Sequence, residues 1–150
     1  MNFSNNNLII NLNSNSANTF FQNEHKILSE NNKRQIALIN SFSTLPQNWD
    51  SYDANVPSNK AISKSVAFVK YLSDKNIEVY FTAPTPDGDI VVEIRKNLAQ
   101  LEFVFSQIDT EDKVIASYDG DFSSEAKIND TTNYAYLKWL ICPNGDCPNF

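Results

Sequence analysis

Residues 77–94 read IEVYFTAPTPDGDIVVEI, and this stretch decides the fold class. Apolar and polar side chains alternate over 77–82, which is typical of a β-strand with one buried face. Prolines, which cannot donate to a sheet, lie close to the Asp87-Gly88 pair, so we expect the chain to turn there. Residues 90–94 return as a second strand. The stretch therefore predicts an antiparallel hairpin whose loop is longer than two residues.

Further strands are expected downstream of this hairpin. Residues 101–105 and 113–118 have strand-like patterns, and the acidic turn at 109–112 separates them. Residues 122–128 fit either a short final strand or a loop. The sequence therefore predicts an antiparallel meander of about four strands.

Two helices are expected before the sheet and one after it. The first covers about 23–42, where apolar side chains fall partly at helical spacing. The second follows Pro57, with Ser58 as its N-cap. Its apolar stripe, which we expect to face the core, consists of Ile62, Ser65, Val66, Val69 and Leu72. Asp130 is expected to cap the last helix, which ends before Pro143. This order predicts an α+β fold with the helices packed on one face of the sheet.

The chain length and composition fit one globular domain. Of its 150 residues, 41% are hydrophobic and 20% charged, unlike a disordered chain. We assign 1–22 to a flexible arm rich in Asn and Ser, 23–141 to the α+β domain, and 142–150 to a flexible tail with Cys and Pro. The apolar run at 8–10 is far shorter than the roughly 20 residues of a membrane span. The N-terminus also lacks the features of a secretory signal. We expect a cytoplasmic protein that does not bind membranes.

The charge balance is acidic. Eighteen acidic and twelve basic residues give a net charge of −6. This balance opposes direct binding to nucleic acid, because a phosphate backbone attracts basic surfaces. We therefore expect a protein partner with a basic surface.

The two cysteines lie near the C-terminus in CPNGDC at 142–147. Two thiols and one histidine are too few for a zinc site within one chain. Reduced thiols on a flexible tail are the preferred interpretation. A small disulfide loop is the alternative in an oxidising compartment, and an intermolecular site is a more remote one.

The most unusual segment is LPQNWDSYDANVPS at 45–58, which concentrates aromatic residues, carboxylates and prolines. In a structural interpretation, Trp49 covers the joint between the first two helices and Asp50 accepts backbone N–H groups in the turn. In a functional one, the same residues form an interface hot spot. The predicted partner-binding residues are Trp49, Asp50, Tyr52, Asp53 and Asp87.

Two motifs in the chain suggest a relationship. Trp49-Asp50-x-Tyr52-x-Ala54 followed by Pro57-Ser58, and then Pro84-Thr85-Pro86-Asp87-Gly88, resemble a widespread group of small uncharacterised bacterial proteins over about 45–106. That group often has Gly where this chain has Ser51 and Asp53. It also often has a Trp soon after the strand, where this chain has Arg95-Lys96. The resemblance implies a bacterial or phage origin and a compact α+β unit, and it assigns no activity to any residue.

No residue pattern indicates a cofactor, a metal site or a catalytic set. Asp87-Gly88-Asp89 and Asp119-Gly120-Asp121 repeat one tripeptide, but turn chemistry explains both. His25 is the only histidine and is expected to be exposed. Carboxylate pairs such as Asp50 with Glu93 can be imagined, although the sequence gives no reason to bring them together.

The sequence thus favours a non-catalytic, acidic protein-binding module, such as an antitoxin, immunity protein, inhibitor or chaperone. One alternative is a nucleic-acid mimic that presents together the carboxylates of Asp109, Glu111, Asp112, Asp119 and Asp121. A second is an enzyme with an unrecognised carboxylate site. A third is an accessory subunit that extends a neighbour's sheet.

Overall fold

The computed structural model describes residues 28–142. Within these residues, three helices and a five-stranded antiparallel sheet with strand order β1-β2-β3-β4-β5 confirm the predicted α+β class. In chain order the elements are α3 (Glu30–Ser41), η1 (Phe42–Thr44), α4 (Asn59–Asp74), β1 (Phe81–Pro84), β2 (Ile90–Lys96), β3 (Ala99–Phe105), η2 (Asp109–Glu111), β4 (Lys113–Tyr118), β5 (Asp121–Lys127) and α5 (Asp130–Ile141).

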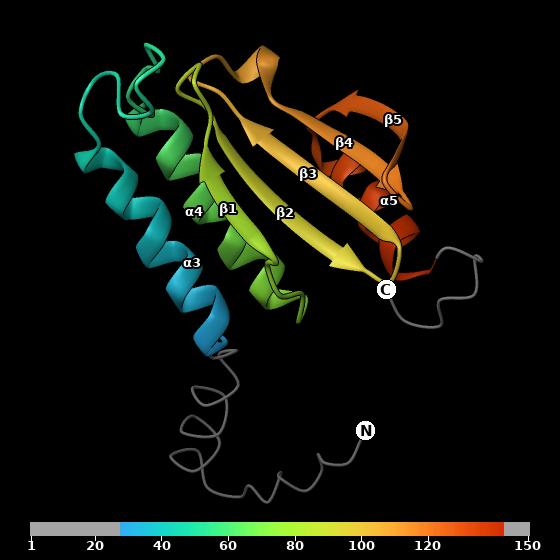
Figure 1. Cartoon of the computed structure of the whole chain (residues 1–150). Coiled ribbons are helices and arrows are strands. Elements are labelled where there is room, and N and C mark those ends of the chain that lie inside the picture. The colour runs from blue at the N-terminus through green and yellow to red at the C-terminus, as the bar shows by residue number, and fades with distance from the viewer. Residues whose placement is uncertain (1–27, 143–150) are drawn as a thin grey trace, which may run out of the picture.

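The helices and the sheet form two layers. Figure 1 shows α4 and α5 behind the sheet, while α3 lies beside α4 along β1. Alternate strand residues point into the core between the layers, and those with no exposed surface are Ile90, Val92, Ile94, Leu101, Phe103 and Val114. Each such side chain contributes roughly 1.5–3 kcal/mol by leaving water. No described helix covers the opposite face, which we call the open face.

Helix α4 forms as the sequence predicts. The Ser58 hydroxyl accepts a hydrogen bond from the Ala61 N–H at 3.0 Å, so it caps the first turn. The expected stripe faces the sheet, except that Val66 is only half-buried. Phe68 adds to this stripe, and its ring lies 4.4 Å from that of Phe103, measured between centroids. The buried stripe of α4 thus packs on the centre of the sheet.

The first described helix is shorter than expected. Helix α3 begins at Glu30 because the Ser29 hydroxyl accepts a hydrogen bond from the Asn32 N–H and caps the helix there. Residues 23–27 of the predicted helix lie outside the described residues. Leu38, one of the apolar residues of this helix, is 43% exposed. Ile39 and Phe42 carry the buried contacts instead.

The first strand also begins later than predicted, at Phe81 rather than near Ile77. Two side chains of α3 occupy the backbone of Val79: Asn31 donates to its carbonyl at 2.7 Å, and Asn32 accepts from its N–H at 2.9 Å. Asn32 is buried and also donates to the Ile77 carbonyl. Residues 77–79, which alternate like a strand, therefore form hydrogen bonds with side chains of α3 instead of with a neighbouring strand.

At the C-terminal side one open point is resolved, and the predicted cap of the last helix is wrong. Residues 121–127 form a fifth strand, β5, which pairs with β4 and is mostly exposed. Helix α5 is present, but Asn129 rather than Asp130 caps it, because the Asn129 side chain accepts from the Thr132 N–H at 2.9 Å. Within 28–142, no helix has the length and apolar character needed to cross a membrane.

Cys142, the last described residue, is disulfide-bonded, so the preferred expectation of a reduced thiol is wrong for this residue. The predicted arm at 1–22, His25 and Cys147 lie outside the described residues.

Candidate functional site

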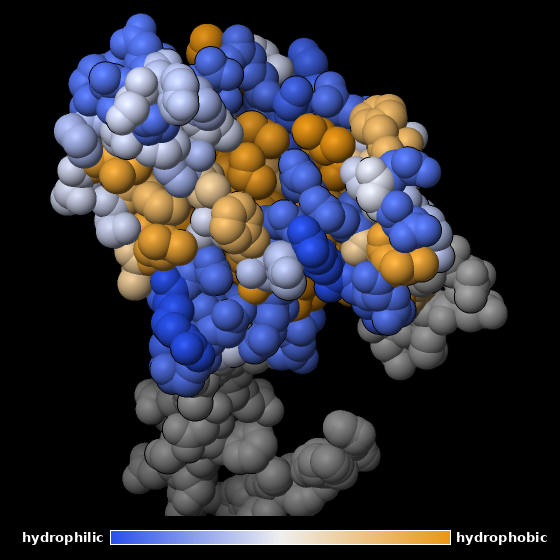
Figure 2. Space-filling model, viewed as in Figure 1, coloured by the Kyte–Doolittle hydropathy of each residue, from blue (hydrophilic) through white to orange (hydrophobic). Residues whose placement is uncertain are grey.

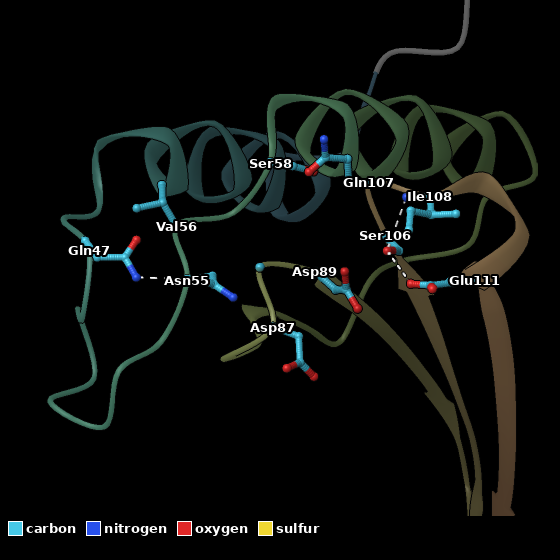
Figure 3. Close-up of a pocket in the computed structure, with 11 residues that line it drawn as sticks. Gln47, Asn55, Val56, Ser58, Asp87, Asp89, Ser106, Gln107, Ile108 and Glu111 are labelled. Atoms are coloured by element: carbon cyan, nitrogen blue, oxygen red, sulfur yellow. Dashed lines mark hydrogen bonds between the residues drawn. The ribbon is translucent and has the colours of Figure 1, made fainter.

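A meander places its connections alternately at the two ends of the sheet. The β1–β2 connection (85–89) and the β3–β4 connection (106–112) therefore lie at one end. The loop 45–58, which leads into α4, joins them, and Figure 3 shows the three segments converging. We call these three segments the loop end. The tight connections at 97–98 and 119–120 form the opposite turn end.

The loop 45–58 is held by its own polar groups. The Asp50 carboxylate accepts hydrogen bonds from the Tyr52 N–H at 2.8 Å and the Ala54 N–H at 3.1 Å, which confirms its predicted turn-stabilising role. The Trp49 indole N–H donates to the Asn55 carbonyl at 2.9 Å. Three residues without glycine's freedom adopt positive φ in this loop, and they are Asn48, Ser51 and Asp53. Trp49 and Asp50 therefore build the loop.

Two backbone hydrogen bonds join this loop to the β1–β2 turn. The Asn55 N–H donates to the Pro86 carbonyl at 2.8 Å, and the Ser58 N–H donates to the Gly88 carbonyl at 3.1 Å. Gly88 has φ +88°, and a Cβ there would lie 3.0 Å from the Val56 carbonyl oxygen. Glycine is needed at this position for both reasons. The two sequence motifs are thus parts of one structure.

A pocket of about 640 Å³ opens between the three segments. Carboxylates line it from two sides: Asp87 and Asp89 come from the β1–β2 turn, and Glu111 comes from η2 (Figure 3). The Ser106 hydroxyl lies between these sides and donates to Glu111 at 3.3 Å. Polar groups of Gln47 and Asn55 complete the lining on the side of the loop 45–58.

The surroundings of Asp89 in the pocket raise its pKa. Burial raises the pKa of Asp89 above its ordinary value, and the negative charges of Asp87, Glu111 and Asp112 raise it further. A hydrogen bond with Ser106 opposes this by lowering the pKa. Because the Ser106 hydroxyl carries one proton and also faces Glu111, it cannot donate to both carboxylates at once. Negative charge in the pocket is therefore incompletely compensated.

The neighbouring acids of the β3–β4 connection are neutralised. Lys64 contacts both oxygens of Asp112, at 2.7 and 2.8 Å, and Lys60 and Lys64 both pair with Asp109. Burial lowers the pKa of Lys64, but hydrogen bonds with Asp112 and Asp109 more than offset this and leave it raised. Hydrogen bonds from Lys60 and, second, from Lys64 lower the pKa of Asp109.

The pocket carboxylates have no such partner. Among the described residues, no lysine or arginine forms an ion pair with Asp87, Asp89 or Glu111. Asp87 and Glu111 are exposed and Asp89 is half-buried. Carboxylates without a cation in a concave site of this size suit a positively charged side chain or a basic surface. The site can therefore attract cations without rearranging its own ion pairs.

The structure separates the predicted partner-binding residues into two groups. Trp49 and Asp50 are half-buried and hold the loop. Tyr52 is 88% exposed beside an exposed Asp53, and Asp87 lines the pocket. The second group is thus available to another molecule.

Other combinations considered from the sequence do not assemble. Asp109, Glu111 and Asp112 precede β4, whereas Asp119 and Asp121 follow it at the turn end. The Asp50 carboxylate is used within its own loop, and Glu93 lies on β2, where it pairs with Arg95. Neither the five-acid group nor the Asp50–Glu93 pair forms one site.

Sequence reasoning missed Asp89, Ser106 and Glu111 as parts of the pocket. A signal for them existed, because a meander brings its first and third connections to the same end of the sheet. Asp89 and Glu111 lie in those two connections.

No cluster of three or more metal-binding side chains occurs in the part of the chain that the structure describes. Comparisons with protein-family models, with curated proteins and with solved structures find no match.

Proposed function

We propose that the protein is a non-catalytic, acidic binding module whose loop end binds a protein partner with a basic surface. The partner's cation enters the pocket between Asp87, Asp89 and Glu111, and Tyr52 makes an aromatic contact beside it. The observation that carries the proposal is the set of three pocket carboxylates without a described ion-pair partner. In contrast, the neighbouring Asp109 and Asp112 of the β3–β4 connection are both paired with lysines. Fixed carboxylates speed and orient the approach of a basic partner.

The proposal includes a biological class. An antitoxin, immunity protein, inhibitor or chaperone of bacterial or phage origin uses such a surface to bind a toxin, an enzyme or a client protein. The proposed origin follows from the two motifs that meet at the loop end. Tyr and Trp are the side chains that most often dominate interface energetics, which supports an anchor role for Tyr52.

Affinity capture tests the proposal. The full chain is immobilised and incubated with lysate of its source cells at low and moderate salt. We expect one stoichiometric basic protein, which is lost with the double variant Asp87→Asn, Glu111→Gln. The matched control Asp119→Asn, Asp121→Asn removes equal charge at the turn end and should retain the partner. Tyr52→Ala should weaken capture without altering the fold, because this side chain is exposed.

A partner that survives the pocket variant, or that is lost equally with the turn-end control, would contradict the proposed site. Capture that salt weakens, and that the pocket variant and the turn-end variant reduce equally, would instead favour the nucleic-acid mimic. The structure does not support that alternative through the acids considered from sequence, because they lie at both ends of β4.

One observation favours a second candidate function, an enzyme that uses the pocket carboxylates. The raised pKa of Asp89 beside the negative charges of Asp87 and Glu111 is an arrangement that general acid–base catalysis can use. Substrate screening of the wild type beside Asp89→Asn tests it. Turnover lost in this variant would support the enzyme, and the absence of any turnover would count against it.

We also propose a cytoplasmic location, which the disulfide at Cys142 opposes because stable disulfides are rare in the cytosol. Thiol titration of protein taken directly from source cells decides this point. Two free thiols would support the cytoplasm, and none would indicate an oxidising compartment.

A further inference from the structure

The open face of the sheet carries a second, chemically distinct feature. Glu93 on β2 and Glu102 on β3 are register partners, so their side chains lie directly opposite each other on this face. Like charges in this position destabilise a sheet. Glu93 is nevertheless only 7% exposed. Two neighbouring acids at the centre of a sheet therefore need compensation by positive charge.

The chain supplies only part of that compensation. Arg95 donates from its Nε to Oε1 of Glu93, and its guanidinium lies 4.1 Å from the centre of the Tyr80 ring. Oε1 of Glu102 accepts from the Gln100 amide at 2.6 Å, a neutral donor. No described residue donates to the second oxygen of either carboxylate. The single described cation therefore pairs with Glu93, and Glu102 has only a neutral donor.

Apolar side chains surround this pair. Phe81 is the register partner of Glu93 on β1, and Ile115 is the register partner of Glu102 on β4. Val91 and Val104 form the neighbouring cross-strand pair. Figure 2 shows hydrophobic groups in the middle of this face, interspersed with strongly hydrophilic ones. Phe81 remains 48% exposed, so the frame is accessible.

We infer that the open face binds an arginine side chain of a partner protein at Glu93 and Glu102. A guanidinium carries five donors in a planar fork and can bridge the two free carboxylate oxygens. Its aliphatic stem packs on the apolar frame, as long basic side chains do on apolar surfaces. The occupant is therefore a segment in which an arginine is flanked by apolar residues, and the site is separate from the loop end.

A second copy of this chain fits the face less well. The charged open-face residues comprise three acids and three bases: Glu93, Glu102, Glu125, Arg95, Lys113 and Lys127. Glu125 and Lys113 already pair with each other, and Arg95 is held by Glu93 and Tyr80. Among the described bases of this face only Lys127 forms no ion pair, and a lysine ammonium lacks the planar fork that bridges two carboxylates.

Amide-resonance mapping by NMR of the isotopically labelled full chain tests this inference. The probe is the blocked tripeptide acetyl-Val-Arg-Val-amide, titrated to millimolar concentration. Its matched control peptide carries citrulline, which keeps the shape of arginine without the charge. We expect the arginine peptide to shift amides of 91–95 and 100–104, and the citrulline peptide to leave them unchanged. Glu102→Gln should weaken binding roughly tenfold or more, whereas the exposed control Glu78→Gln should not.

Several outcomes would overturn the inference. They are no shifts at millimolar probe, equal shifts with both peptides, and shifts confined to 85–89 and 106–112. The last would place the cation in the loop-end pocket. Concentration-dependent line broadening of the free protein across the open face would point to self-association instead.

Discussion

The tripeptide Asp-Gly-Asp occurs once at each end of the sheet, in two different environments. At the loop end, Gly88 is buried against the Val56 carbonyl, and Asp89 is partly desolvated in the pocket. At the turn end, Gly120 has no atom within 4 Å of where its Cβ would be, and Asp121 is exposed. The same residues are thus part of a built site at one end and of a simple turn at the other.

The comparison shows what distinguishes a site from a turn. At the loop end, two backbone hydrogen bonds join the loop 45–58 to the β1–β2 connection, and the β3–β4 connection lines the same pocket. The turn end has a single such link, from the Asp119 N–H to the Leu98 carbonyl at 2.9 Å. Substitutions at matched positions should therefore have larger effects at the loop end.

The largest loss of stability is expected for Asp112→Ala. This substitution removes the partner of Lys64 and the acceptor of the Ser106 N–H, and it leaves a partly buried ammonium without its main counter-charge. We expect a loss of about 3 kcal/mol in the free energy of unfolding, measured by chemical denaturation. Asp109→Ala, at the exposed partner of the same lysine, should have little effect. Equal losses for both variants would mean that Asp112 does not hold the connection.

The two glycines of the repeated tripeptide allow a matched comparison, in which the stability cost of Gly88→Ala is set against that of Gly120→Ala. Both residues have positive φ, so each alanine should cost about 1 kcal/mol in backbone strain. Gly88→Ala also pushes a methyl group against the Val56 carbonyl, and we expect it to cost about 2 kcal/mol or more in total. Denaturation curves of the two variants measure the difference. If Gly120→Ala cost as much, the close approach at the loop end would have no energetic weight.

A smaller effect is expected for Asp50→Ala, which removes the acceptor of two backbone N–H groups. By analogy with caps, we expect a loss of about 1 kcal/mol and faster hydrogen exchange at Tyr52 and Ala54. Asp121→Ala at the turn end should leave stability unchanged. Unchanged exchange at Tyr52 and Ala54 would show that the loop does not depend on this carboxylate.

The smallest effect concerns the pH dependence of Asp89→Asn. The folded-state pKa of Asp89 is raised, so the folded chain holds its proton to higher pH than the unfolded chain does. Stability should then fall as pH rises from the ordinary carboxyl pKa to the raised one. Asp89→Asn should remove this cost, with a gain of less than about 1 kcal/mol at neutral pH that disappears in acid. A gain that persisted in acid would have another cause.

Local patterns predicted the elements whose causes are local. Ser58 caps α4, and 90–94 returns as β2 after the Asp87-Gly88 turn, because both depend on neighbours in sequence. The start of β1 was misplaced because Asn31 and Asn32, about 47 positions away, occupy the Val79 backbone. The pocket was missed for a similar reason. Asp50 was correctly interpreted, whereas Asp89 and Glu111 become neighbours only through the meander.

Tyr52 and Tyr118 allow the most direct test of binding at the loop end, since both are exposed and they lie at opposite ends. A photo-crosslinking phenylalanine analogue replaces each in turn, and the chain is irradiated in source-cell lysate. The account predicts one discrete adduct with a basic protein from position 52 and none from position 118. An adduct from position 118 alone, or from neither position, would contradict it.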